Sequence, residues 1–341
     1  MRVVTFGELM LKLSAPGYTR LFQTPELDAM FCGSEANVAV SLAQFGVGSA
    51  FVAELPDNDV GKAALRSLRS FGVDCSHIPL GKGRMGIYYA EKGASQRGSK
   101  VIYDRAGSAI ALAAPEDFDW EAIFSGADWF HWSGITPALS DSAAKITLEA
   151  CQTAKRMGLM VSCDLNYRKK LWSPDKAQTV MSELVSYADV CVANEEDADK
   201  CLGIKAENTD VERAQLDAGA YRQVARAIHE RYGCSKVAVT LRESYSASRN
   251  GWSGLLYNAA TDDVLTSRKY QLDIVDRVGG GDSFSAGLIY GFGNGMTDQE
   301  ALEFAVAASC LKHSIEGDFN LVSTEEVQAL VQGSGNGRVQ R

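Results

Sequence analysis

Residues 276–284 read Asp-Arg-Val-Gly-Gly-Gly-Asp-Ser-Phe, between the strand-like run YQLDIV and the apolar-periodic segment Phe284–Phe292. This order predicts a strand, a glycine-rich loop and then a helix. Glycines let the backbone turn tightly, and the N–H groups at a helix start can converge on an anion at the positive end of the helix dipole. The segment therefore predicts an anion site with Asp282 beside it.

Asp282 has two interpretations. An acid at a helix start is favoured as a cap, so the motif alone leaves a purely structural role open. A triple glycine with an acid on each side is more than capping requires. Phosphoryl transfer needs donors for the phosphoryl oxygens and a carboxylate that takes the proton of the attacking hydroxyl. We favour this chemistry, with Asp282 as the base.

The two common nucleotide motifs are missing. The sequence contains no GxxxxGK[ST] segment, and Gly291-x-Gly293-x-Gly295 lacks the last element of GxGxxG. A P-loop enzyme and a dinucleotide-binding oxidoreductase are therefore both unsupported.

Composition excludes several classes of protein. The chain has 341 residues, a formal net charge of −9 and eight cysteines that form no CxxC pair. The negative charge argues against a nucleic-acid or anionic-membrane partner. Cys310 and His313 share a helical face but are too few for a metal site, and reduced buried thiols explain the cysteines. No secretory segment and no membrane-spanning run are present, which predicts a soluble cytoplasmic protein.

Strand and helix signals alternate after Asp128, which predicts βαβ units and a mostly parallel sheet with helices on both faces. The strand-like runs are Trp129–Trp132, Leu159–Asp164, Val190–Ala193 and Val237–Leu241. Ligands of such sheets bind beyond the carboxyl ends of the strands. Four polar residues lie at or just past such ends: Asp164, Asn166, Asn194 and Thr240.

Two segments differ from this pattern. Residues 12–31 lack helical periodicity, and residues 83–106 contain two strand-like runs of a hairpin. We predict that they form one small β-rich lid over the site. Residues 1–11, 32–82 and 107–332 then form the α/β core, and 333–341 a flexible tail.

The motifs resemble those of a known family. DRVGGGDSFSAGL resembles the DTxGAGDxFxxG signature of the ribokinase-like (PfkB) carbohydrate kinases. GSEANVA at 33–39 is similar to that family's early glycine and asparagine motif, and NEED at 194–197 falls where the family carries NxxE. The resemblance implies a ribokinase-like three-layer α/β/α fold with a mostly parallel sheet, a small β-sheet lid, and the use of ATP and Mg²⁺.

Within the family the chain is most similar to the 2-keto-3-deoxygluconate kinases, through DLNYR at 164–168, Leu171-Trp172 and Tyr103-Asp104-Arg105. This similarity implies phosphorylation of 2-keto-3-deoxy-D-gluconate at O6 by ATP. A sugar acid brings a carboxylate, for which guanidinium is the best bidentate partner. Arg105 and Arg168 are candidates, with surface solvation as the alternative. A kinase for fructose or another sugar or sugar acid, and a catalytically silent sugar-acid sensor, remain alternatives.

The resemblance also assigns residues. Asp282 is the base, and the Gly279, Gly280 and Gly281 amides form the anion hole. The expected substrate-binding residues are Gly33, Asn37, Tyr89, Tyr103, Arg105, Arg168, Asp282 and Asp318. The expected ATP-binding residues are Asn194, Thr240, Arg242, Ser244, Gly279 and Gly281. Tyr88 and Tyr89 point to opposite faces of a strand, so only one of them can face the site.

Three positions depart from the family pattern. Arg242 stands in place of a phosphate-loop glycine, and either pairs with ATP phosphates or is an exposed turn residue. Asp197 shortens the usual glutamate, so Glu196 or Asp197 is expected to hold Mg²⁺ through water. Arg277 replaces the usual threonine, which argues against a monovalent-cation site near Asp276. The exposed edge of the lid predicts a homodimer formed through the lid.

Overall fold

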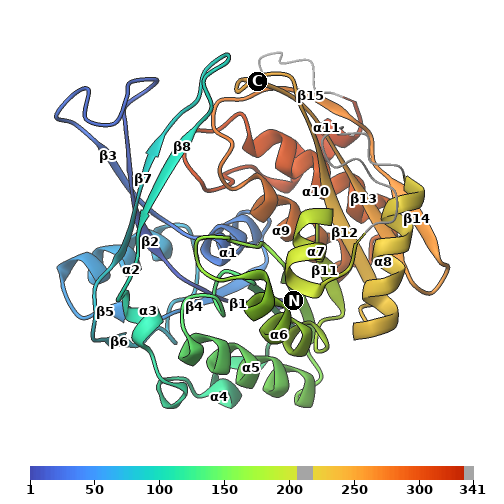
Figure 1. Ribbon diagram of the computed structural model, residues 1–341, viewed down its shortest axis with the longest axis horizontal. Helices are drawn as coiled ribbons and strands as arrows, with labels where there is room; N and C mark the ends of the chain where they lie inside the picture. The colour runs from blue at the N-terminus through green and yellow to red at the C-terminus, as the bar shows by residue number, and fades with distance from the viewer. Residues whose placement is uncertain (206–217, 334–341) are drawn as a thin grey trace.

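A computed structural model of the chain describes residues 1–205 and 218–333 (Figure 1). Within these residues the largest sheet has nine strands, in the order β14-β13-β12-β11-β10-β9-β1-β4, with β15 paired to β13. Their bounds are β1 Arg2–Phe6, β4 Gly48–Val52, β9 Trp129–Ser133, β10 Met160–Asp164, β11 Val190–Val192, β12 Lys236–Ser244, β13 Arg249–Asn258, β14 Asp263–Thr266 and β15 Tyr270–Asp273. Six neighbouring strands of this sheet pair in parallel, in the order β12-β11-β10-β9-β1-β4. The alternating sequence pattern predicted this arrangement.

Helices cover both faces of this sheet, because successive side chains of a strand point to opposite sides. On β9, Phe130 and Trp132 pack into one buried cluster, and Trp129 packs into another. Helices α3 Ala109–Leu112, α4 Trp120–Phe124, α5 Asp141–Arg156, α6 Pro174–Val185, α7 Glu195–Leu202 and α8 Ala218–Tyr232 lie on the first face, with the short 3-10 turn η1 Pro115–Asp117. Helices α1 Ser34–Gln44, α9 Gly280–Gly293, α10 Asp298–Lys312 and α11 Thr324–Val331 lie on the second. The predicted three-layer fold is confirmed.

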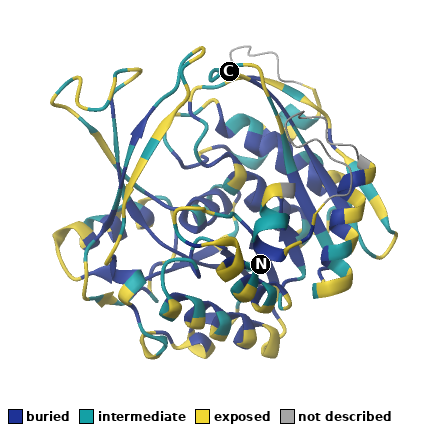
Figure 2. Cartoon of the chain, viewed as in Figure 1, coloured by how far each residue is buried: buried dark blue, intermediate teal, exposed yellow. Residues whose placement is uncertain are grey.

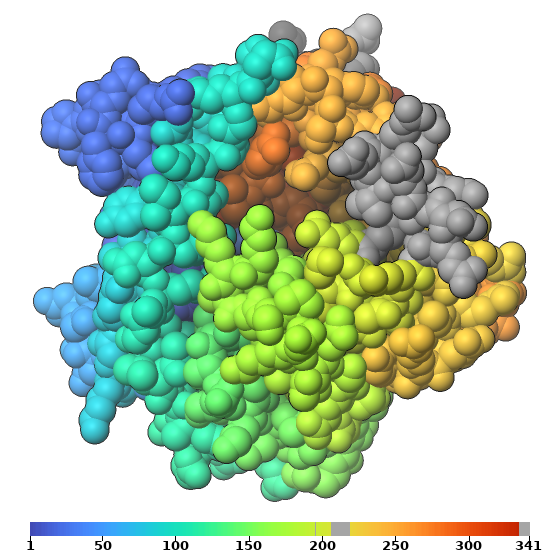
Figure 3. All heavy atoms as spheres, in the orientation of Figure 1, coloured from blue at the N-terminus to red at the C-terminus, as the bar shows by residue number. Residues whose placement is uncertain are grey.

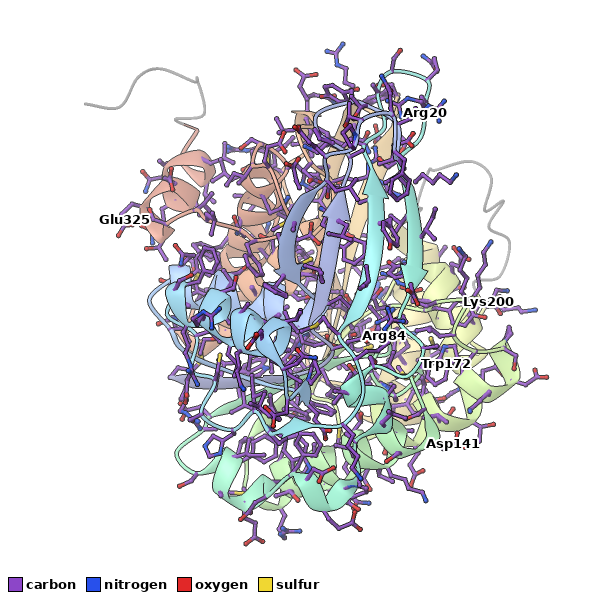
Figure 4. All side chains as sticks on the ribbon, turned by 90° about the vertical axis from the view of Figure 1, so that its left-hand side faces the viewer. Arg20, Arg84, Asp141, Trp172, Lys200 and Glu325 are labelled. Atoms are coloured by element: carbon purple, nitrogen blue, oxygen red, sulfur yellow. The ribbon has the colours of Figure 1, made fainter. Side chains whose placement is uncertain are left out.

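A second sheet stands apart from the core on the left of Figure 1. Its order is β3-β2-β7-β8, with bounds β2 Met10–Ser14, β3 Asp28–Cys32, β7 Gly86–Glu91 and β8 Lys100–Asp104. Seen from the side, its strands rise from Arg84 at the base to Arg20 at the tip (Figure 4). These strands match the predicted lid segments, except that β2 begins two residues earlier, at Met10, and β3 ends one residue later, at Cys32. Helix α2 Asp59–Ser70 packs against its lower end, beside the two-stranded pair β5 Leu55–Pro56 and β6 Leu80–Gly81.

Two features differ from the sequence-based expectation. The antiparallel edge formed by β13, β14 and β15 was not predicted, because it interrupts the alternation of strands and helices. Helix α9 begins at Gly280, so two of the three glycines lie in its first turn and not in a preceding loop. The predicted tail lies outside the described residues, apart from Gly333. No helix in the described part of the chain is long and apolar enough to cross a membrane.

Candidate active site

A cavity of about 1330 Å³ opens between the lid, the carboxyl ends of the parallel strands and the start of α9. Figure 3 shows this hollow between the lid at the left, the segment after β10 below and the edge of β12 and β13 above. Its lining joins residues that are far apart in sequence, including Gly33, Tyr103, Asp164, Thr240 and Asp282. The parallel sheet therefore brings its polar strand ends to one place, as expected for this architecture.

Asp282 lies in the first turn of α9 and is partly buried at the floor of the cavity. Its carboxylate accepts hydrogen bonds from the Ser34 hydroxyl (2.7 Å) and from the Asn37 side-chain amide (2.7 Å). Burial raises the pKa of Asp282 to about 6, although the bonds from Asn37 and Ser34 work in the opposite direction. A carboxylate with a pKa of about 6 is ionised at neutral pH and is a stronger base than an ordinary aspartate.

The glycines beside Asp282 have different structural reasons. Gly279 precedes the helix with φ of +84°, and a Cβ there would lie 2.0 Å from the carbonyl oxygen of Asp318. A Cβ on Gly280 would meet the His313 ring at 2.5 Å, whereas a Cβ on Gly281 would meet nothing within 4 Å. Because the first N–H groups of a helix have no partner within it, this glycine turn offers amide donors to an anion in the cavity.

Two aromatic residues from the lid line the cavity, Tyr88 from β7 and Tyr103 from β8. The Tyr88 hydroxyl donates to the buried carboxylate of Asp318. Tyr89 lies on the opposite face of β7, where its ring centroid is 6.1 Å from that of Phe22. The prediction that Tyr89 faces the site is therefore wrong: the alternation rule was right, but the sequence could not decide which face of the strand is which.

The two candidate carboxylate-binding arginines differ in their surroundings. Arg105 lines the cavity but is paired with Glu8, whose carboxylate accepts from Nε of Arg105 at 2.7 Å. Both side chains of this pair are largely buried, with exposed fractions of 9% and 2%. Arg168 is exposed at the mouth of the cavity, and within the described residues its guanidinium forms no ion pair. Arg168 is therefore the guanidinium that is free to meet a substrate carboxylate.

The opposite end of the cavity is lined by Asn194, Thr240, Arg242 and Arg277. Burial, and next the charge of Arg277, lower the pKa of Arg242, so two guanidinium groups lie close together. Within the part of the chain that the structure describes, neither of them has a carboxylate partner. Two neighbouring unpaired guanidiniums favour a polyanion. Ser244, the remaining predicted ATP-binding residue, does not line the cavity.

Comparisons with known proteins identify the family of the chain. Residues 1–324 match the family model of the pfkB family carbohydrate kinases. The chain belongs to this family. It is 33% identical over 335 residues to a protein from Haloferax volcanii named 2-dehydro-3-deoxygalactonokinase, with 98% of both chains covered.

Two solved structures are also similar. A 2-dehydro-3-deoxygluconokinase from Thermotoga maritima is 50% identical, with a TM-score of 0.93, over 98% of this chain and 100% of that one. A putative 2-keto-3-deoxygluconate kinase from Enterococcus faecalis is 27% identical, with a TM-score of 0.90, over 100% and 99% of the two chains. The chain is thus a carbohydrate kinase of the PfkB family.

Most residues predicted for the substrate side of this kinase do meet in the cavity. Besides Asp282 and the glycine turn, the lining includes Gly33, Asn37, Tyr103, Arg105, Arg168 and Asp318. Gly33 has a structural reason to be glycine, because a Cβ there would lie 2.0 Å from the carbonyl oxygen of Glu8. Asp318 is fully engaged, since it accepts from Tyr88 and from Lys12 at 2.5 Å. Asp318 thus anchors the lid strands to the loop below α9.

The sequence placed Asp164 and Asn166 at the ligand-binding edge of the sheet without giving them a role, and it did not single out Ser34. Ser34 holds Asp282, and Asp164 and Asn166 line the cavity at the end of β10. Asp164 and Asn166 carried a signal, because they lie in the DLNYR motif at a strand end. The only sequence signal for Ser34 is its place in the GSEAN motif. Its hydrogen-bond partner, Asp282, is 248 positions away in the chain. Such pairing follows from tertiary structure alone.

The family implies Mg²⁺, and the acids near Asn194 fit that ion as indirect ligands. Asp197 accepts from the Tyr167 backbone N–H at 3.1 Å and from Asn194 Nδ2 at 2.8 Å. Burial raises the pKa of Asp197 to about 6, and burial with the charges of Asp197 and Asp282 raises that of Asp164. Among the described residues, no three acid, His or Cys side chains are placed to enclose a metal ion directly. Carboxylates that repel one another favour a cation held through water and phosphate oxygens.

Proposed function

We propose that the chain transfers the γ-phosphoryl group of ATP to the O6 hydroxyl of 2-keto-3-deoxy-D-gluconate. The observation that carries this proposal is the pairing of two features in one cavity. Asp282, a partly buried carboxylate, lies at a glycine-led helix start, and Arg168 offers a guanidinium that has no ion-pair partner among the described residues. The names of the similar proteins support the substrate, since 2-dehydro and 2-keto denote the same group.

In the proposed reaction the Asp282 carboxylate takes the proton of the O6 hydroxyl. The O6 oxygen then forms a bond to the γ-phosphorus while the bond from that phosphorus to the β-γ bridging oxygen breaks, and ADP leaves with the bond electrons. Ser34 and Asn37 keep the carboxylate aimed at the cavity through their two hydrogen bonds. The product is the 6-phosphate of the sugar acid.

The negative charge that develops on the moving phosphoryl group needs fixed donors. The glycines at the start of α9 line the cavity beside Asp282, and their N–H groups would serve as donors that need no reorganisation. Arg242 and Arg277 line the same cavity and would bind the remaining phosphates. When bound, Mg²⁺ neutralises phosphate charge, with Asn194, Glu196, Asp197 and Asp164 as the residues that would hold it through water.

The substrate's other end would lie under the lid. Arg168 would bind its carboxylate, and Gly33, Asn37 and Tyr103, which line the same cavity, would contact the rest of the sugar acid. Arg105 contributes only if its pair with Glu8 opens or if the substrate carboxylate joins that pair. The lid closes this end to water, which would otherwise accept the phosphoryl group.

A coupled assay of ADP release tests the substrate. The panel contains 2-keto-3-deoxygluconate, its C4 epimer 2-keto-3-deoxygalactonate, fructose and ribose. The highest kcat/KM on the gluconate form supports the proposal, and a preference for fructose contradicts it. The epimer is the second candidate substrate, because the Haloferax volcanii relative carries the galactonate name. ATP turnover at background with saturable binding of the sugar acid would instead identify a silent sensor.

A homodimer formed through the lid is part of the same proposal. Much of β8 is exposed (Figure 2), and it carries Ile102 and Tyr103 at 43% and 39% exposure. Phe22, at the tip of the lid, is 70% exposed. Apolar groups on an open sheet edge favour pairing with a second lid. Light scattering after gel filtration should give twice the chain mass, and the variant Ile102→Asp should shift it toward the monomer; a monomeric wild type refutes this part.

A further inference from the structure

Lys312, the last residue of α10, is fully buried beneath the active site. Its ammonium group donates to the backbone carbonyl oxygens of Asp276 (3.4 Å) and Ile315 (3.2 Å). The first carbonyl belongs to the loop that leads into Gly279, and the second to the loop that follows α10. Lysine is almost never fully buried without partners, so these two loops form a specific cation site.

The charges around this ammonium are already balanced. Lys12 from the lid lies 2.5 Å from a carboxylate oxygen of Asp318 and 3.6 Å from one of Asp276. Asp276 and Asp318 are also the two carboxylates that act most strongly on Lys312. Two buried lysines thus face two buried carboxylates. An additional metal ion would leave this group with a net positive charge and no carboxylate of its own.

The lysine lies directly below the anion hole. A Cβ placed on Gly279 would lie 3.4 Å from Cε of Lys312 and 2.0 Å from the carbonyl oxygen of Asp318. The Asp276 carboxylate links the same two loops, because it accepts from the backbone N–H groups of Val278 (3.1 Å) and Gly317 (3.2 Å). The position of the Gly279–Gly281 amides therefore depends on how these two loops are held together.

We infer that the Lys312 ammonium occupies the place of a monovalent metal ion beneath the anion hole, and that the kinase needs no such ion for activity. Backbone carbonyl oxygens from two loops beside carboxylates are the ligands that such an ion would use. Here the carbonyls of Asp276 and Ile315 already accept hydrogen bonds from Lys312. A monovalent-cation site near Asp276, which the replacement of the usual threonine by Arg277 already argued against, therefore does not fit the residues present. Lys312 acts as a positioning residue for the proposed phosphoryl transfer.

The first measurement uses the wild-type kinase. Its kcat is measured in chloride salts of K⁺, Na⁺, NH₄⁺ and tetramethylammonium at equal ionic strength, after removal of monovalent metal ions. We expect kcat and the melting temperature to differ by less than about twofold and about one degree among the salts, because no ion binds. Saturable activation by K⁺, Na⁺ or NH₄⁺, relative to tetramethylammonium, would overturn the inference.

The second measurement compares variants. Lys312→Ala empties the space between the carbonyls, and Lys312→Met fills it without a charge. Both should lower kcat roughly tenfold or more, since small misplacements of catalytic groups are costly. NH₄⁺ or K⁺ should restore activity to Lys312→Ala in a saturable manner, but not to Lys312→Met. The exposed Lys145 on α5 is the control: Lys145→Ala should match the wild type in every salt.

Two further outcomes refute the inference: a folded Lys312→Ala with unchanged kcat, or an inactive one with a native melting curve that no cation restores. If Lys312→Ala does not fold, the wild-type salt series alone decides. The assay uses whichever acceptor the substrate panel identifies, so a wrong sugar acid does not affect the result. If no acceptor is phosphorylated, the proposed function fails, and ion-dependent stabilisation of Lys312→Ala, absent in the wild type, still tests the cation site.

Discussion

Replacement of Asp282 by asparagine removes the proposed base and keeps the size of the side chain. The structure allows the new amide to fit. Its oxygen can accept from Asn37, and its nitrogen can donate to the hydroxyl oxygen of Ser34, which lies 2.7 Å from the present carboxylate. Helix α9 keeps its start because Gly279 and Gly280, not Asp282, make the close contacts there. The variant should therefore fold and bind both substrates.

The expected loss is that of a general base. Proton transfer by a positioned side chain contributes roughly 10²- to 10⁴-fold, or about 3 to 5 kcal/mol of barrier. The wild-type kcat should also fall as the pH is lowered through about 6, because Asp282 must be ionised to act. The residual activity of Asp282→Asn should show no such step.

Although Asp282→Asn should lower kcat, it should raise the free energy of unfolding at neutral pH. The pKa of Asp282 is raised in the folded protein from 3.8 to about 6, so the unfolded chain holds fewer protons between these values. The free energy of unfolding therefore falls as the pH rises through this window, by at most about 3 kcal/mol. Solvent in the cavity screens the partly exposed carboxylate, so about 1 to 2 kcal/mol is realistic. Asp282→Asn removes this cost and should be more stable than the wild type at neutral pH.

Two assays decide: ADP release across the pH range, and urea unfolding at neutral pH. Asp141→Asn is the matched control, because Asp141 is an exposed acid on α5, at the lower right of Figure 4. It should leave kcat and its pH dependence unchanged. An Asp282→Asn protein that kept more than a tenth of the wild-type kcat would refute the role of the base. Lower stability than the wild type at neutral pH would refute the account of its pKa.

The remaining predictions concern three groups. Arg168→Ala should raise KM for the sugar acid at least about tenfold with little change in KM for ATP, as loss of a charge-assisted bond predicts; equal effects on both substrates would contradict carboxylate binding. Gly279→Ala should lower the free energy of unfolding by about 1 to 3 kcal/mol in urea titrations, while Gly281→Ala, with open space at its Cβ, should not. Glu35→Gln should raise the free energy of unfolding above about pH 7. Burial raises the pKa of Glu35 to about 7, so its ionisation lowers the stability of the wild type as the pH rises. Urea titrations at low and high pH that show no higher free energy of unfolding for the variant would disprove this.

The sequence predicted the layered core because periodicity and strand-end residues are local signals. The predicted strands Trp129–Trp132 and Leu159–Asp164 were found as β9 and β10 to within one residue at either end. The lid hairpin was also predicted, but the side of β7 that faces the cavity was not. Side-chain parity along a strand is fixed by its pairing in the sheet, here with β2 and β8, and not by the strand's own residues.

Charge pairing within the site could not be predicted at all. Arg105 looked free in the sequence, whereas the structure gives it Glu8, 97 positions earlier in the chain. Arg242 and Arg277 looked like unrelated departures from a family pattern, and the structure places them close enough to act on each other. Because buried charges must be balanced, their partners are chosen by the three-dimensional fold and can lie anywhere in the chain.

The electrostatics of the site explain why these pairings matter for catalysis. Burial raises the pKa of Asp282 and so makes its carboxylate a stronger base. The same burial makes it less favourable for neighbouring acids to be ionised. Two buried cations under the proposed anion hole, Lys12 and Lys312, offset this effect, whereas Arg168 and Arg242 have no carboxylate partner in the described part of the chain. Arg168 and Arg242 can then bind anions without first losing a protein partner. The buried lysines that hold the loops under the anion hole are thus different residues from the arginines proposed to bind ligands. These loops therefore need not rearrange when substrates bind.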